Sequence, residues 1–153
     1  MTVSHSSGIH SLSGSSPLVQ QVTLTEPTLW SPDQVPPELA DTPTYYQRLI
    51  GPTPPTAFQF SEIMHTLQEE SELLGCTDGS YVEAEDQCYQ GWIVASDASR
   101  TIAEGSGAGH GHPNVLSLYR AELSGILALL YLVYHISSYH GITAGAIRVY
   151  CDN

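Results

Sequence analysis

Three acidic residues stand at positions that packing alone does not explain. Asp78 falls within a predicted central strand, where aspartate is rare and a buried charge needs a partner or a metal. Glu122 lies four residues from both Leu118 and Ile126, so it shares a helical row with apolar side chains and points toward the core. Asp152 ends the last predicted strand. These carboxylates are therefore the candidates for a functional site.

Carboxylates that converge repel one another unless a divalent cation neutralises them. A ligand set made only of oxygen atoms suits Mg²⁺ or Mn²⁺. Two such ions held about 4 Å apart stabilise both the attacking water and the leaving oxygen when a phosphodiester is hydrolysed. The sequence therefore predicts that Asp78, Glu122 and Asp152 are metal ligands and catalytic residues, with Mg²⁺ or Mn²⁺ as the cofactor.

The segments that would position these acids follow a pattern typical of a mixed α/β sheet. Three closely spaced strands are predicted first, as an antiparallel meander. A long helix follows, ended by Gly141, and a helical crossover leads to a fourth strand. The predicted ranges are 72–82, 88–96 and 101–109 for the first strands, about 115–140 for the helix, and 146–153 for the last strand. If the first and last strands are parallel neighbours, Asp78 and Asp152 meet at their carboxyl ends, where open α/β sheets place ligands.

Apolar side chains in these segments predict how the core is filled. The run of Trp92, Ile93 and Val94 indicates a strand buried on both faces. Cys76 and Cys151, on adjacent predicted strands, are expected to be small core residues rather than a redox pair. The apolar row of the helix is expected to comprise Leu118, Ile126, Leu129, Leu130 and Val133.

The first 71 residues differ in composition from the rest of the chain. Residues 1–40 are rich in Ser, Thr, Pro, Gln and Gly without a sustained apolar period, so they are predicted to be a disordered tail. Residues 41–71 are predicted to be a linker with short helical segments, interrupted by the proline-rich GPTPPT. Residues 72–153 are predicted to form the folded domain.

The charge balance restricts the classes of partner. The chain of 153 residues has a formal net charge of −12, with 16 acidic residues against four Arg and no Lys. Such a surface repels phosphate, so composition alone argues against binding of nucleic acid. Three cysteines without CxxC spacing favour free thiols in a reducing, intracellular compartment, the cytoplasm or the nucleus. The most apolar run, residues 126–133, is too short to span a bilayer, so no membrane association is predicted.

Three short motifs resemble those of ribonuclease H (type 1), in the same order and on the same kinds of element. Residues 77–80 (TDGS) resemble the opening motif of that family, and residues 120–123 (RAEL) resemble its helix motif. Residues 151–153 (CDN) resemble the motif that closes its fourth strand. The resemblance covers roughly residues 72–153 and implies a ribonuclease H-like mixed sheet of three antiparallel strands, a long helix and a fourth strand.

The resemblance also implies an activity and a set of roles. Asp78, Glu122 and Asp152 would be the first three metal-binding carboxylates, and Ser80 and Asn153 would lie near the substrate. The implied reaction is the metal-dependent hydrolysis of the RNA strand of an RNA–DNA hybrid. The implied partner is therefore that hybrid.

Two further expectations concern the ends of this region. In the family, a fourth metal-site carboxylate, further helices and a fifth strand follow the third motif, whereas here the chain ends at Asn153. The domain is therefore expected to be incomplete at its C-terminus and to be weakly active or inactive alone. Residues 40–51 (ADTPTYYQRLIG) loosely resemble a segment that joins a reverse transcriptase to its ribonuclease H in a retrotransposon polyprotein, which implies a reverse transcriptase domain as a partner.

Two alternatives remain open at this stage. One is a non-catalytic remnant or nucleic-acid-binding module of the same fold. The other is an acidic protein-interaction domain that uses no metal. A proofreading exonuclease of the same broad fold fits less well, because its first motif carries Asp-x-Glu, whereas Asp78 is followed by Gly79 and Ser80.

Overall fold

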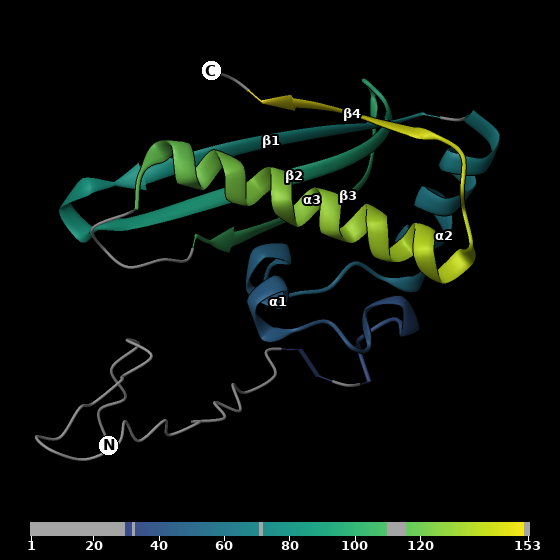
Figure 1. The fold of residues 1–153 in the computed structure, drawn as a ribbon, viewed down its shortest axis with the longest axis horizontal. Coiled ribbons are helices and arrows are strands. Elements are labelled where there is room, and N and C mark those ends of the chain that lie inside the picture. Colours follow the sequence, from purple (N-terminus) through teal and green to yellow (C-terminus); the bar gives the residue numbers. More distant parts are fainter. Residues whose placement is uncertain (1–29, 32, 71, 110–115, 152–153) are drawn as a thin grey trace, which may run out of the picture.

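Strands and helices form two layers, with a mixed sheet on one side and the helices packed on one of its faces (Figure 1). The computed structural model describes residues 30–151, except for residues 32, 71 and 110–115. In chain order the elements are η1 (Pro37–Leu39), α1 (Thr44–Ile50), α2 (Ala57–His65), η2 (Thr66–Glu70), β1 (Glu72–Val82), η3 (Glu83–Glu85), β2 (Gln87–Asp97), β3 (Arg100–Ala108), α3 (Leu118–His140) and β4 (Ala146–Cys151).

The sheet has the strand order β3-β2-β1-β4. Strands β1 and β2 pair antiparallel, with Asp78 opposite Gly91, and β2 pairs antiparallel with β3. Strand β4 returns through α3 and pairs parallel to β1, with Thr77 opposite Cys151. The predicted antiparallel meander and the predicted parallel pairing of the first and last strands are therefore confirmed. The chain is an α/β protein with an open mixed sheet of four strands in its described part.

Side chains alternate between two unlike faces of the sheet, as the period of two along a strand requires. In β1, Leu73 and Thr77 are buried on the face that α3 covers. Cys76 and Asp78, on the alternate positions, are exposed. No described element covers that second face, which we call the open face.

The open face overturns two predictions about the core. Trp92 and Val94 are buried, as expected, but Ile93 between them is 37% exposed. A continuous apolar run therefore does not mean burial on both faces here, because the described helices all pack on one side. Cys76, on the open face, is likewise an exposed free thiol rather than a core residue, and Cys151 is exposed because it ends the edge strand β4.

Helix α3 begins and ends where its sequence supplies capping groups. The Ser117 hydroxyl oxygen accepts a hydrogen bond from the Arg120 backbone N–H at 3.2 Å. Gly141 follows the last turn with φ of 64°, a left-handed conformation that glycine adopts without a steric penalty. The Ile142 N–H then reaches back to the Ser137 carbonyl oxygen at 2.8 Å, which closes the helix.

The predicted apolar row of α3 is only partly buried. Leu129 and Val133 lie in the core and Ile126 is half-buried, but Leu118 and Leu130 are 53% and 44% exposed. The helix is long and apolar enough, by length and composition, to cross a membrane. Core helices of soluble proteins pass the same test, and 44% of its most apolar stretch is buried inside the fold.

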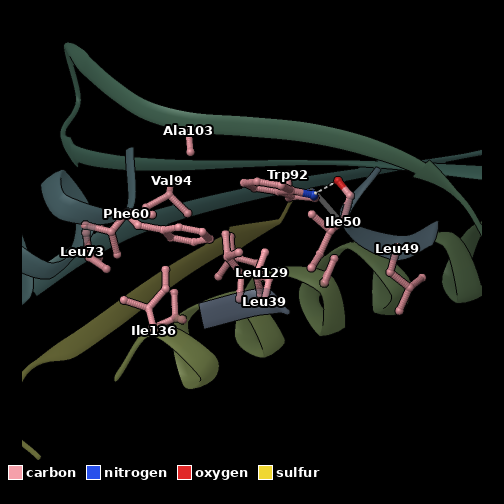
Figure 2. Close-up of a cluster of buried hydrophobic side chains, with 14 of the residues drawn as sticks. Leu39, Leu49, Ile50, Phe60, Leu73, Trp92, Val94, Ala103, Leu129 and Ile136 are labelled. Carbon is pink, nitrogen blue, oxygen red and sulfur yellow. Dashed lines mark hydrogen bonds between the residues drawn. The ribbon is translucent and has the colours of Figure 1, made fainter. Parts of the chain in front are cut away.

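The segment before β1 contributes to the same core rather than acting as a linker. Its buried side chains include Trp30, Leu39, Leu49, Ile50, Phe60, Ile63 and Leu67. Figure 2 labels Leu39, Leu49, Ile50 and Phe60 among them. The short helices predicted within 41–71 are present, but they bury apolar surface, which a linker does not. The predicted tail of residues 1–40 also contains two core residues, while residues 1–29 lie outside the described part.

Hydrogen bonds from two tryptophans hold the end of α1 in place. The last carbonyl groups of a helix lack partners within the helix. The Trp92 indole N–H donates to the Ile50 carbonyl oxygen at 2.9 Å (Figure 2), and the Trp30 indole N–H donates to the Gly51 carbonyl oxygen at 2.8 Å. A core residue of β2 thus ties α1 to the sheet.

Candidate functional site

Glu122 is a buried carboxylate on the face of α3 that packs on the sheet. Glu122 is only 5% exposed, as its position in the apolar row of the helix predicts. One carboxylate oxygen, Oε1, accepts a hydrogen bond from the Gly79 backbone N–H at 3.1 Å. The other, Oε2, is buried and has no hydrogen-bond partner among the residues that the structure describes. A buried carboxylate with an unpartnered oxygen is costly unless a proton or a cation satisfies it.

The close approach of α3 to β1 depends on the absence of a side chain at Gly79. A Cβ atom at this position would lie 2.5 Å from the Glu122 backbone nitrogen and 2.8 Å from the carbonyl carbon of Ala121. Any larger residue would force the first turns of α3 away from the sheet. The glycine of the TDGS motif therefore has a positioning role that the sequence did not reveal, although a glycine inside a strand often marks such an approach.

Asp78 lies next to this contact in the chain but its side chain is exposed. Thr77 and Gly79 face α3, so Asp78 faces the open side of the sheet. The prediction that Asp78 is a buried charge is therefore wrong. The peptide nitrogen that donates to Glu122 is bonded to the Asp78 carbonyl carbon. Glu122 of α3 therefore meets the backbone beside Asp78, while the Asp78 side chain leaves β1 on the face away from α3.

Two hollows border Asp78, and the larger is lined both by open-face side chains and by residues 50–53, which follow α1. The larger has a volume of about 480 Å³, and its lining includes Glu104, Ser106 and Cys76. The smaller has a volume of about 110 Å³ and is lined in part by Ser80, the predicted substrate-binding residue. Asp78 and Ser80 thus share one face of β1, open to solvent, as a substrate contact would need.

Asp152 and Asn153 lie outside the described residues. The last described pair between β1 and β4 is Thr77 with Cys151. In the sequence an aspartate follows each of them, Asp78 after Thr77 and Asp152 after Cys151. Within the described part of the chain, no group of three or more His, Cys, Asp or Glu side chains is arranged to hold a metal ion. The structure therefore brings Glu122 to the backbone beside Asp78 and does not test the third carboxylate.

Other buried polar groups surround the place where α3 crosses β1 and β2. The hydroxyl oxygen of Thr77 and the side-chain oxygen of Gln90 are both buried without hydrogen-bond partners. A Cβ atom at Gly125, one turn after Glu122, would lie 3.1 Å from the Thr77 Cβ and 3.6 Å from the Gln90 Cβ. These residues were not predicted to take part in a site. Their only signal in the sequence is a polar residue at a position that the strand period assigns to the core.

The nearby thiol is poorly suited to bind metal. Cys88 is buried on the covered face of β2, and burial raises the pKa of its thiol, with the Arg120 guanidinium acting in the opposite direction. A raised pKa favours the protonated thiol over the thiolate that binds metal.

Comparison with family models, with curated proteins and with solved structures finds no match to this chain. The chemistry of the site must therefore be argued from its own residues. Those residues define an α/β protein in which a buried glutamate on the main helix meets the backbone of an aspartate-bearing central strand.

Proposed function

We propose that this chain carries the first part of a ribonuclease H-like metal site, whose reaction is hydrolysis of the RNA strand of an RNA–DNA hybrid. The observation that carries the proposal is the environment of Glu122. Its carboxylate is buried, one oxygen accepts a hydrogen bond from the Gly79 N–H, and the other has no partner in the described part of the chain. A divalent cation would satisfy that oxygen and offset the cost of burying the charge.

The proposed ligands are Asp78, Glu122 and Asp152, with Mg²⁺ or Mn²⁺ as the ion. When bound, the ion would activate a water molecule and neutralise charge on the scissile phosphate. The Gly79 N–H fixes the orientation of Glu122, and Ser80 on the open face lies where it can contact the hybrid. Because Asp78 leaves β1 on the open face, its side chain must change position for both carboxylates to bind one cation, whose attraction opposes their mutual repulsion.

The order and pairing of the elements support the same proposal. Three antiparallel strands, a long helix and a strand parallel to the first are the arrangement that the motif resemblance implies. The parallel pairing places the end of β4, at Cys151, beside Thr77 in the middle of β1, directly before Asp78. A retroelement origin, an intracellular location and a reverse transcriptase partner belong to this proposal as its biological setting.

One observation favours a second candidate, a non-catalytic module of the same fold. The Asp78 side chain is exposed on the open face of β1, whereas Glu122 lies between α3 and the other face, and the chain carries a formal net charge of −12. A protein that grips a nucleic-acid duplex normally neutralises several phosphates with Lys or Arg. A domain in which Glu122 keeps its hydrogen bond from the Gly79 N–H but binds no metal ion would retain the fold without catalysing hydrolysis.

Thermal unfolding in the presence of Mn²⁺ separates the two candidates. An ion present at about 100 times its Kd adds about 2.7 kcal/mol of stability, which raises the unfolding temperature of a chain of this size by about 5–10 °C. We expect Glu122→Gln to abolish this rise and Asp78→Asn to reduce it. Glu85→Gln, which changes an exposed carboxylate in η3, is the matched control and should leave the rise intact.

Cleavage of a labelled RNA–DNA hybrid then tests the reaction itself. We expect this chain alone to cleave weakly or not at all, with any cleavage confined to the RNA strand and dependent on Mg²⁺ or Mn²⁺. Robust turnover would refute the expectation of weak activity but support the nuclease assignment. An absent Mn²⁺ effect on unfolding, together with an absence of cleavage, would favour the non-catalytic module.

A further inference from the structure

Helix α3 carries a continuous apolar stripe on the side that faces away from the sheet. Its members are Tyr119, Leu123, Leu127, Leu130 and Tyr134, which are 67%, 46%, 37%, 44% and 65% exposed. At about 100° per residue, these five positions fall within roughly 80° of one another around the helix axis. Large apolar side chains that gather in this way on a surface mark an interaction site more often than scattered ones do.

No described element lies over this stripe. Helix α3 crosses one face of the sheet with its opposite side turned outward, and α1 packs beside it (Figure 1). The contact with α1 is made by a neighbouring position, where the Tyr131 and Tyr46 rings stack with their centroids 3.7 Å apart. The stripe is therefore separate from both the core and the α1 contact.

The order of residues in the stripe is nearly the same in both directions. A tyrosine stands at each end, and leucines occupy the positions between them. If two α3 helices cross antiparallel with a two-fold axis between residues 126 and 127, Tyr119 of one copy faces Tyr134 of the other. Leu123 then faces Leu130, and Leu127 lies at the axis. Interfaces with two-fold symmetry require this kind of self-complementary surface.

We propose that the stripe is a homodimer interface, in which a second copy of this chain packs its α3 antiparallel against the first. The five side chains expose roughly 500 Å² per copy, so the pair would bury about 1,000 Å², the lower limit for a specific interface. This proposal does not depend on the proposed function, because Glu122 faces the sheet and lies outside the stripe.

The distribution of charge allows two acidic chains to meet at this surface. Helix α3 contains a single Asp or Glu, Glu122, and that residue is buried. The stripe itself carries no ionisable carboxylate or base. The many acidic residues of the chain lie on other elements, and their repulsion is screened over about 8 Å at physiological ionic strength. A second copy is therefore a suitable occupant for a neutral, apolar stripe on an otherwise acidic protein.

Sedimentation of the full chain tests the proposal. Between about 1 and 200 µM we expect a reversible monomer–dimer equilibrium, since an interface of this size is typically of micromolar affinity. Leu127→Arg should raise the dimer Kd at least about tenfold by placing two like charges at the axis. Ile93→Arg is the matched control, because Ile93 is also 37% exposed but lies on the open face of the sheet.

Mixing two variants tests the symmetry of the contact. Leu127→Arg and Leu127→Glu chains should each be monomeric, and an equimolar mixture should form a heterodimer, because the two copies of residue 127 lie within one residue of the axis and so close to each other. The double variant Tyr119→Arg/Tyr134→Glu should dimerise on its own only if the helices are antiparallel. Far-UV circular dichroism and unfolding temperature confirm that each variant folds, as expected for exposed positions.

Three outcomes would overturn the proposal. The first is a monomer at every concentration, and the second is a dimer that Leu127→Arg leaves unchanged. The third is co-sedimentation with neutral phosphatidylcholine vesicles in place of self-association, which would assign the stripe to a lipid surface. Failure of the Mn²⁺ experiment would leave the dimer intact, so the two proposals can fail separately.

Discussion

The two faces of the sheet carry similar types of residue, but the residues on one face are buried and those on the other are exposed. On the covered face, Trp92 is buried and bonded to α1, and Gly79 allows α3 to approach closely enough for its N–H to hold Glu122. On the open face, Ile93 and Asp78 are exposed, although each adjoins a covered residue in the chain. The difference shows that a residue's contribution depends on which face it occupies more than on its own hydrophobicity or charge.

Alanine substitution of Trp92 and of Ile93 should give the largest difference in the free energy of unfolding. Trp92→Ala removes a fully buried ring and its hydrogen bond to Ile50, and should lower the free energy of unfolding by about 3–5 kcal/mol. Ile93→Ala should cost less than about 1 kcal/mol, because its side chain already contacts water. Urea unfolding of both variants measures the comparison, and similar losses would mean that the open face is covered in solution.

Two glycines on facing strands offer a sharper comparison. Gly79→Ala places a methyl group 2.5 Å from the Glu122 backbone and should cost about 1–3 kcal/mol, because α3 must shift. The same shift should weaken the effect of Mn²⁺ on unfolding. Gly91→Ala is the control, since its added Cβ would meet only the Gly105 carbonyl oxygen at 3.9 Å. Equal losses from the two substitutions would contradict the close packing at Gly79.

A smaller effect is the pH dependence of stability that His135 contributes at the border of the covered face. Burial lowers the pKa of His135 from 6.5, and its ring lies between those of Tyr131 and Tyr134. A lowered pKa in the folded state means that the unfolded chain binds the proton more readily. The contribution of neutral His135 to stability is therefore complete above pH 6.5 and is lost as the pH falls through the folded pKa.

Urea unfolding midpoints measured between pH 8 and pH 5 test the direction of this pH dependence of stability. The native chain should lose more stability on acidification than His135→Gln, since the carboxylates that also titrate are common to both. His65→Gln, at an exposed position of α2, serves as the control and should follow the native chain. A native chain that gains stability relative to His135→Gln at low pH would show that the pKa of His135 is raised instead.

The order and type of the elements from β1 to β4 could be predicted because each depends on local signals. Alternating side chains and a turn marked the hairpins, and Gly141 marked the end of α3. The inward position of Glu122 was predictable for the same reason, because four-residue spacing places it among apolar neighbours. The segment before β1 was misjudged, since its prolines suggested a linker while the burial of Phe60 and Ile63 depends on surfaces far away in the chain.

The candidate site was predictable only in part. Its acidic residues and their order along the chain could be taken from the motifs, but the face on which Asp78 emerges could not. That face follows from which side of the sheet α3 packs, and this depends on contacts such as Gly79 with Ala121 and Glu122.

By itself, the sequence of this protein determined the local elements and placed an acid on a central strand and another on the apolar side of a helix. These features follow from backbone propensity and from the periods of strand and helix, which act over a few residues. Only the tertiary structure decided that Glu122 binds the Gly79 backbone, that Ile93 and Asp78 face solvent, and that no described element covers the stripe on α3. Each of these depends on long-range packing, because burial is a property of neighbouring surfaces rather than of a residue type.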